Sequence, residues 1–152
     1  MYKKSKINVL LIGLGRIGCF YDRDNAISKA SHFGAIVNSK GLRLKAICDK
    51  DIKTINKISS EYKIDKYTSI EQIDLEENFD LIVIATPDKT HHEIVKYALR
   101  LKPKVIFIEK PLSTNIKSTE EIIHLSNESK IGLMVNFSRR FNPFFQNLKE
   151  IF

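Results

Sequence analysis

Short apolar runs alternate with helical patterns along the whole chain. Five runs rich in Ile, Val and Leu predict strands that are covered on both faces. They span Ile7–Ile12, Leu42–Cys48, Leu81–Ala85, Val105–Glu109 and Leu133–Phe137. Alternation of such strands with helices predicts a parallel, doubly wound sheet with right-handed crossovers, which is an α/β fold.

The segments between these strands carry helix signals. Capping-box patterns that begin at Thr90 and Ser118 open two helices. Apolar residues at helical spacing indicate another helix over Ile52–Tyr62, and a further one follows Ser31. The predicted helices therefore cover about 31–40, 52–62, 90–100 and 118–130.

The last segment of the chain is an apolar helical stripe. The stripe consists of Phe144, Phe145, Leu148, Ile151 and Phe152. Such a stripe needs a partner surface, so it packs back on the domain or leads into a second domain or a subunit contact. We place one domain at 1–140 and a crossover helix at 141–152, and we expect a homo-oligomer.

Length and composition narrow the class of protein. The chain has 152 residues, of which 43% are hydrophobic and 28% charged, as in one soluble globular domain. The net charge of +7 does not indicate a nucleic-acid partner, because the lysines are scattered rather than clustered. No run is long enough for a membrane helix, and Cys19 and Cys48 form no disulfide or metal pattern. We therefore expect a cytoplasmic protein without a metal site.

A glycine turn follows the first strand directly. Its sequence is Gly13-Leu14-Gly15-Arg16-Ile17-Gly18. The first glycine permits the tight turn, the second lets the backbone approach a pyrophosphate, and the third lets a helix pack close to the strand. We predict that this turn, including Arg16 and Ile17, binds a dinucleotide through N–H groups at a helix start.

An acidic residue ends the second strand. Asp49 stands where a carboxylate accepts hydrogen bonds from the adenosine ribose and repels a 2′-phosphate, so NAD is favoured over NADP. The adjacent Lys50 weakens that preference. Asp49 lies 31 positions after Gly18, against about 20 in the common unit, so we infer an insertion over 22–31. For Tyr21 and His32, which flank this insertion, a structural role is favoured over a catalytic one.

Three later strand ends complete a family pattern. Ala85-Thr86-Pro87 closes the third strand, Glu109-Lys110-Pro111 closes the fourth, and the segment 136–143 follows the fifth. Together with the glycine turn and Asp49, they resemble the glucose–fructose oxidoreductase, inositol dehydrogenase and rhizopine-catabolism (Gfo/Idh/MocA) family from residue 7 to residue 143. The resemblance implies a Rossmann domain followed by a larger α/β domain with an open antiparallel sheet. The chain stops where that second domain begins, so alone it is expected to bind cofactor and catalyse little.

The resemblance assigns roles at the strand ends. Lys110 is expected to orient the substrate and relay a proton, and an ammonium there would stabilise negative charge on a reacting oxygen. Glu109 either pairs with Lys110 or anchors the nicotinamide ribose. A cis peptide bond before Pro111 would fix the direction of the lysine.

The remaining candidates border the cofactor cleft. Thr86 and Pro87 are expected to cover the dinucleotide, and His91 to line the cleft, although a structural role at the helix start suits His91 equally. Arg140 either contacts the carboxamide region of the cofactor or braces the domain junction.

These assignments predict the cofactor domain of an NAD-dependent oxidoreductase that moves hydride between nicotinamide and a sugar, polyol or sugar nucleotide. The alternative is a non-catalytic NAD(H) sensor or partner subunit. Lys110 favours the enzyme, since a module that only binds cofactor needs no ammonium on the substrate side.

Overall fold

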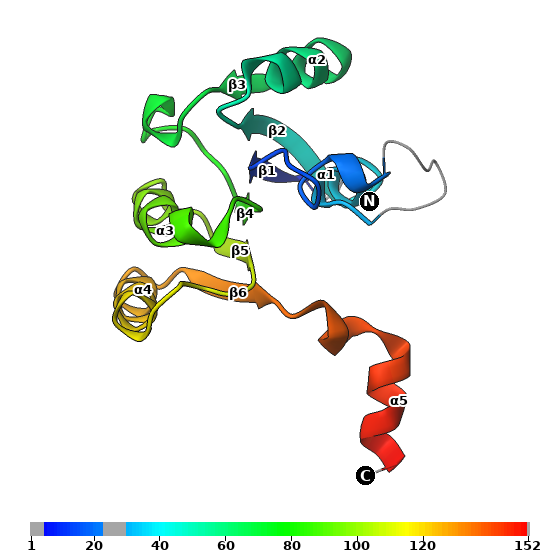
Figure 1. The fold of residues 1–152 in the computed structure, drawn as a ribbon. Helices are drawn as coiled ribbons and strands as arrows, with labels where there is room; N and C mark the ends of the chain where they lie inside the picture. The colour runs from blue at the N-terminus through cyan, green and yellow to red at the C-terminus, as the bar shows by residue number, and fades with distance from the viewer. Residues whose placement is uncertain (1–4, 23–29, 152) are drawn as a thin grey trace.

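The computed structural model describes residues 5–22 and 30–151. Within these residues, six strands form one parallel sheet in the order β3-β2-β1-β4-β5-β6 (Figure 1). The strands are β1 Ile7–Ile12, β2 Leu42–Cys48, β3 Asp65–Tyr67, β4 Leu81–Ile84, β5 Val105–Glu109 and β6 Gly132–Asn136. The predicted doubly wound α/β fold is confirmed, and the strand order reverses beside β1.

In the described part of the chain, five α-helices connect these strands or follow the last one. They are α1 His32–Val37, α2 Ile52–Tyr62, α3 His91–Arg100, α4 Ile116–Glu128 and α5 Pro143–Ile151. Short 3₁₀ turns cover η1 Phe20–Asp22, η2 Ile70–Gln72, η3 Asp88–Thr90 and η4 Ser138–Phe141.

Both faces of the sheet are buried. Successive residues of β1 alternate between two cores: Val9 packs with Phe33 of α1 on one face, whereas Leu10 packs with Val95 of α3 on the other. Helix α4 adds Ile122 to the second core. This two-sided burial explains why the strands are continuous apolar runs rather than alternating ones.

The capping-box predictions are wrong, although both helices exist. At the start of α3 the Thr90 hydroxyl donates to the Pro87 carbonyl and makes no cap hydrogen bond. Helix α4 begins earlier than predicted, because Asn115 accepts a hydrogen bond from the Ser118 N–H at 2.9 Å and is the true cap. Helix α1 is shorter than predicted, and the three-residue strand β3 was not predicted.

The final helix leaves the body of the domain (Figure 1). Phe144 is 66% and Phe145 40% exposed, so the described part of the stripe does not pack back on the sheet. The side chains of Leu148, Ile151 and Phe152 lie outside the described residues, as does most of the predicted insertion. No helix among the described residues is long and apolar enough to cross a membrane.

Candidate functional site

The three glycines of the turn differ in how much space surrounds them. Gly13 has a φ of 92°, and a Cβ there would lie 2.7 Å from the Ala85 carbonyl carbon. A Cβ at Gly18 would lie 2.0 Å from the Gly13 oxygen. A Cβ at Gly15 would meet no atom within 4 Å. Packing of the chain itself therefore requires glycine at the first and third positions, whereas the second faces open space.

Asp49 is joined to this turn. Its Oδ2 accepts a hydrogen bond from the Leu14 N–H at 2.6 Å, and its Oδ1 accepts one from the Asp51 N–H at 2.9 Å. The Gly13 N–H donates to the Cys48 carbonyl at 2.8 Å, which closes the turn against the end of β2. The carboxylate is thus held against the backbone of the glycine turn, at the end of β2. Lys50 is exposed next to it.

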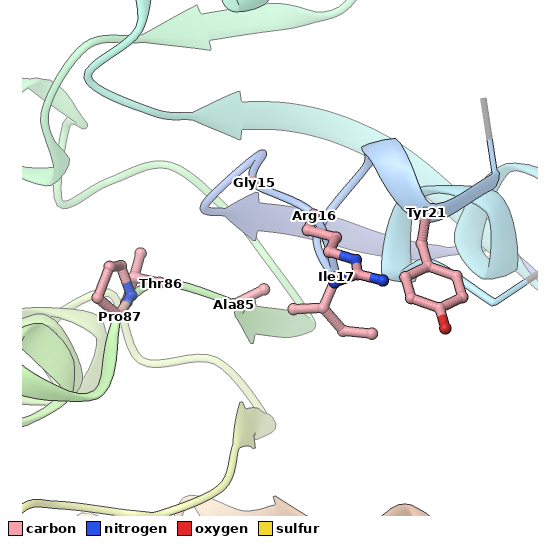
Figure 2. Close-up of a pocket in the computed structure, with 7 residues that line it drawn as sticks. All are labelled: Gly15, Arg16, Ile17, Tyr21, Ala85, Thr86 and Pro87. Atoms are coloured by element: carbon pink, nitrogen blue, oxygen red, sulfur yellow. The ribbon is translucent and has the colours of Figure 1, made fainter. Parts of the chain in front are cut away.

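A cavity of about 520 Å³ opens between the turn and the end of β4 (Figure 2). This volume suits a small-molecule ligand. The Arg16 guanidinium lies over the Tyr21 ring, 5.1 Å from its centroid, at one side of the cavity. The lining residues are Gly15, Arg16, Ile17, Tyr21, Ala85, Thr86 and Pro87.

His91 lies inside the protein, not on the cavity wall. The residue is 0% exposed. Its Nδ1 is 2.7 Å from the Pro111 carbonyl oxygen, and its Nε2 is 2.9 Å from the Thr86 carbonyl oxygen. The ring therefore joins the loop after β4 to the loop after β5, and these contacts fit the structural alternative.

Glu109 contacts two side chains at the end of β5. Its Oε1 lies 2.9 Å from His32 Nε2 and accepts a hydrogen bond from Asn136 Nδ2 at 2.6 Å. Among the residues that the structure describes, no ion pair joins it to Lys110, which is exposed. The Lys110–Pro111 peptide bond is cis.

The cysteines offer no reactive group at the site. Neither Cys19 nor Cys48 is part of a disulfide, and both side chains are buried. Burial, with smaller contributions from the charges of Asp49 and Glu71, raises the pKa of the Cys48 thiol to about 12. The thiol stays protonated at neutral pH and packs as a small apolar side chain. No cluster of potential metal ligands occurs within 5–22 and 30–151.

Arg140 is distant in chain order from the turn and belongs to η4, before α5. The residue is exposed, and its carbonyl accepts a hydrogen bond from Gln146 Nε2 at 3.1 Å. The neighbouring Arg139 lies over the Phe145 ring, 5.5 Å from its centroid. These contacts tie η4 to α5, and the contact of Arg140 with the cofactor stays a prediction.

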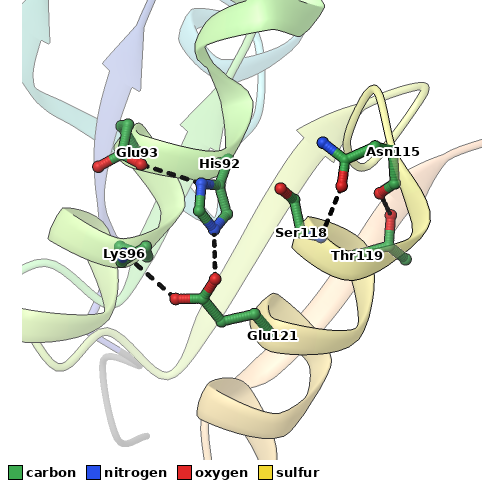
Figure 3. A network of polar contacts seen from close by, with 7 residues as sticks. All are labelled: His92, Glu93, Lys96, Asn115, Ser118, Thr119 and Glu121. Atoms are coloured by element: carbon green, nitrogen blue, oxygen red, sulfur yellow. Dashed lines mark hydrogen bonds and ion pairs between the residues drawn. The ribbon is translucent and has the colours of Figure 1, made fainter.

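A separate polar network joins α3 to α4 (Figure 3). His92 contacts Glu93 and Glu121, each at 2.9 Å, and Lys96 contacts Glu121 at 3.2 Å. Lys96 first, and His92 second, hold the pKa of the Glu121 carboxyl below its usual value. All of these partners belong to the helix pair, so the network braces α3 against α4.

The chain matches the model of the oxidoreductase family with an NAD-binding Rossmann fold, Gfo/Idh/MocA, over residues 7–137. It belongs to this family. The Gfo/Idh/MocA domain is 32% identical over 143 residues to the uncharacterized oxidoreductase YrbE of Bacillus subtilis, covering 93% of this chain and 38% of that protein. It is 29% identical over 140 residues to inositol 2-dehydrogenase of Rhizobium meliloti, covering 92% of this chain and 38% of that protein.

A solved structure shows the same fold. The myo-inositol 2-dehydrogenase of Lactobacillus plantarum superimposes with a TM-score of 0.79 at 26% identity, over 97% of this chain and 41% of that one. This Gfo/Idh/MocA chain therefore spans about two fifths of the length of these relatives. The predicted family and its nicotinamide-cofactor-binding Rossmann domain are confirmed.

Two residues that flank the predicted insertion lie near the candidate site residues. Tyr21 lines the cavity, and His32 contacts Glu109. The structural role favoured for both residues stays a prediction. Their position beside the glycine turn was the available signal. The contact of His32 with a residue 77 positions away had no signature in spacing.

Proposed function

We propose that this chain is the cofactor-binding part of an NAD-dependent oxidoreductase that acts on the hydroxyl or carbonyl group of a sugar, polyol or sugar nucleotide. The observation that carries the proposal is the pairing of open space at Gly15 with a carboxylate fixed beside the turn. Two relatives named inositol dehydrogenases support the polyol class.

The residues present fit a dinucleotide. Gly15 leaves room for a ligand that the chain's own packing does not fill, and backbone N–H groups of the turn suit a pyrophosphate. Asp49 would accept hydroxyl donors of the adenosine ribose. Thr86 and Pro87 would cover the other side of the cavity. When bound, the nicotinamide accepts or supplies the hydride.

The substrate side of the proposal rests on β5. Lys110 is exposed at the carboxyl end of the sheet, where ligands bind in open α/β folds. Its ammonium would stabilise negative charge on a reacting oxygen and ease proton transfer there. Glu109 would accept hydroxyl donors of the nicotinamide ribose, since its charge is not paired with Lys110.

The cofactor preference follows from charge. The carboxylate of Asp49 would repel the 2′-phosphate of NADP, so NAD is preferred despite the exposed Lys50. The Asp49→Asn variant removes the charge at nearly constant shape. Asp74→Asn is a matched control, because Asp74 is exposed and its side chain accepts a hydrogen bond from the local Glu76 N–H.

Calorimetric titration with NADH and NADPH tests the proposal. We expect micromolar NADH binding, NADPH binding about tenfold weaker, which is about 1.4 kcal/mol, and a ratio near one in Asp49→Asn. Asp74→Asn should behave like the unchanged chain. Absence of NADH binding, or an unaltered ratio in Asp49→Asn, would count against the assignment.

A further inference from the structure

Glu109 has two unequal carboxylate oxygens. Oε1 receives both contacts, from His32 Nε2 at 2.9 Å and from Asn136 Nδ2 at 2.6 Å. Within 5–22 and 30–151, no hydrogen bond or ion pair reaches the other oxygen, Oε2. The NH₂ group of asparagine can only donate, so Oε1 accepts this hydrogen bond as a carboxylate oxygen.

The contacts come from three different elements. Glu109 ends β5, Asn136 ends β6, and His32 begins α1. The side chains of His32 and Glu109 are only 12% and 14% exposed, so water screens this contact weakly. The His32 ring also packs edge-on against Phe107 of β5, with centroids 5.7 Å apart. The carboxylate is therefore held by side chains from two other elements, α1 and β6.

His32 also depends on the glycine turn for its position. Its N–H donates to the Ile17 carbonyl at 3.0 Å, and the next residue, Phe33, donates to the Gly18 carbonyl at 2.8 Å. These bonds attach the start of α1 to the end of the turn. His32 thus links the phosphate-binding turn to the end of β5, on the side of the sheet where a nicotinamide half would lie.

We propose that His32 and Asn136 are positioning residues, which clamp one oxygen of Glu109 and leave the other to accept hydroxyl donors of the second ribose of the dinucleotide. The inference rests on the proposed function. Fixing a carboxylate before a ligand arrives lowers the entropy lost on binding, so the clamp raises affinity without touching the ligand.

Substitution of His32 separates this role from packing. Glutamine can place its Nε2 donor near that of histidine and keeps the contact, whereas leucine keeps the volume and removes the donor. Asn136→Leu removes the second donor in the same way. His124→Leu is the control, because His124 is exposed on α4 and, among the described residues, pairs only with Glu128, its neighbour one turn away.

Binding of three ligands shows which part of the dinucleotide each substitution affects. ADP carries the adenosine and pyrophosphate, ADP-ribose adds the second ribose, and NADH adds the nicotinamide. In the unchanged chain, ADP-ribose should bind more tightly than ADP. His32→Leu and Asn136→Leu should each lose about tenfold for ADP-ribose and NADH while ADP binding stays within about twofold. His32→Gln should recover most of the loss.

The outcomes separate the two proposals. Equal losses for all three ligands, or failure of glutamine to rescue, would mean that His32 supports the fold rather than Glu109. Leucine variants that bind ADP-ribose normally would overturn the clamp and leave the proposed function standing. An unchanged chain that binds neither ADP nor NADH would overturn both.

Discussion

Two carboxylates lie at the carboxyl edge of the sheet, Asp49 after β2 and Glu109 at the end of β5, and they are held differently. Backbone N–H groups of Leu14 and Asp51 hold Asp49, within 35 residues of it in sequence. Side chains hold Glu109, from positions 77 and 27 residues away. A backbone contact survives most substitutions of its donor residue, whereas a side-chain contact is lost with one substitution.

The largest effect is expected on stability, in the glycine turn whose backbone holds Asp49. Gly18→Ala should lower the free energy of unfolding by about 3 kcal/mol or more, because its Cβ would lie 2.0 Å from the Gly13 oxygen. Urea unfolding measures this loss. Gly15→Ala is the matched control and should unfold like the unchanged chain, since its Cβ meets nothing within 4 Å. Equal destabilisation by both would contradict the roles given to these glycines.

Gly15→Ala, the control for stability, is expected to affect ligand binding instead. Gly15→Ala should weaken NADH binding about tenfold while leaving the fold intact, since its methyl group would enter the space assigned to the pyrophosphate. Calorimetry on the folded variant checks this. Unchanged NADH affinity would place the ligand elsewhere.

A double-mutant cycle compares the two carboxylates directly. Asp49→Asn and Glu109→Gln should each weaken NADH binding several-fold. The losses should add to within about 0.5 kcal/mol, because the two groups serve different riboses. Strong coupling between the two substitutions would mean that both carboxylates act on one part of the ligand.

The smallest effect is expected at a third, exposed carboxylate. Glu121 contacts Lys96 and His92 on the surface (Figure 3). Its pKa is lowered in the folded chain, so its stabilising effect is present at neutral pH and is lost as the pH falls through the folded-state pKa. Glu121→Gln should shift Tm by less than about 3 °C at pH 7, and thermal unfolding at pH 7 and pH 3 should show the difference vanish at low pH. A large shift at neutral pH would make this network a major support of the fold.

The difference between Asp49 and Glu109 also explains what the sequence could predict. Five of the six strands, the turn and Asp49 follow from local patterns, because buried parallel strands and glycine turns have short-range signatures. Strand β3 was missed because it spans only Asp65–Tyr67, which contains two charged residues and a tyrosine and so has no apolar run. The predicted start of α4 was wrong because Asn115, not Ser118, caps the helix.

Long-range side-chain contacts had no such signature. His32, Glu109 and Asn136 come together only because β5 and β6 end, and α1 begins, at one edge of the sheet. The same applies to His91, whose partners Thr86 and Pro111 belong to two loops. Sequence identified Glu109 and His91 as candidates but could not identify their partners.

The most direct test of the central claim is amide chemical-shift mapping of the isotope-labelled 152-residue chain during titration with NADH. A dinucleotide that lies across both carboxylates predicts shifts in the glycine turn, at Asp49 and around Glu109, with little change on the outer face of α4. Shifts confined to one carboxylate, or centred on α5, would contradict it.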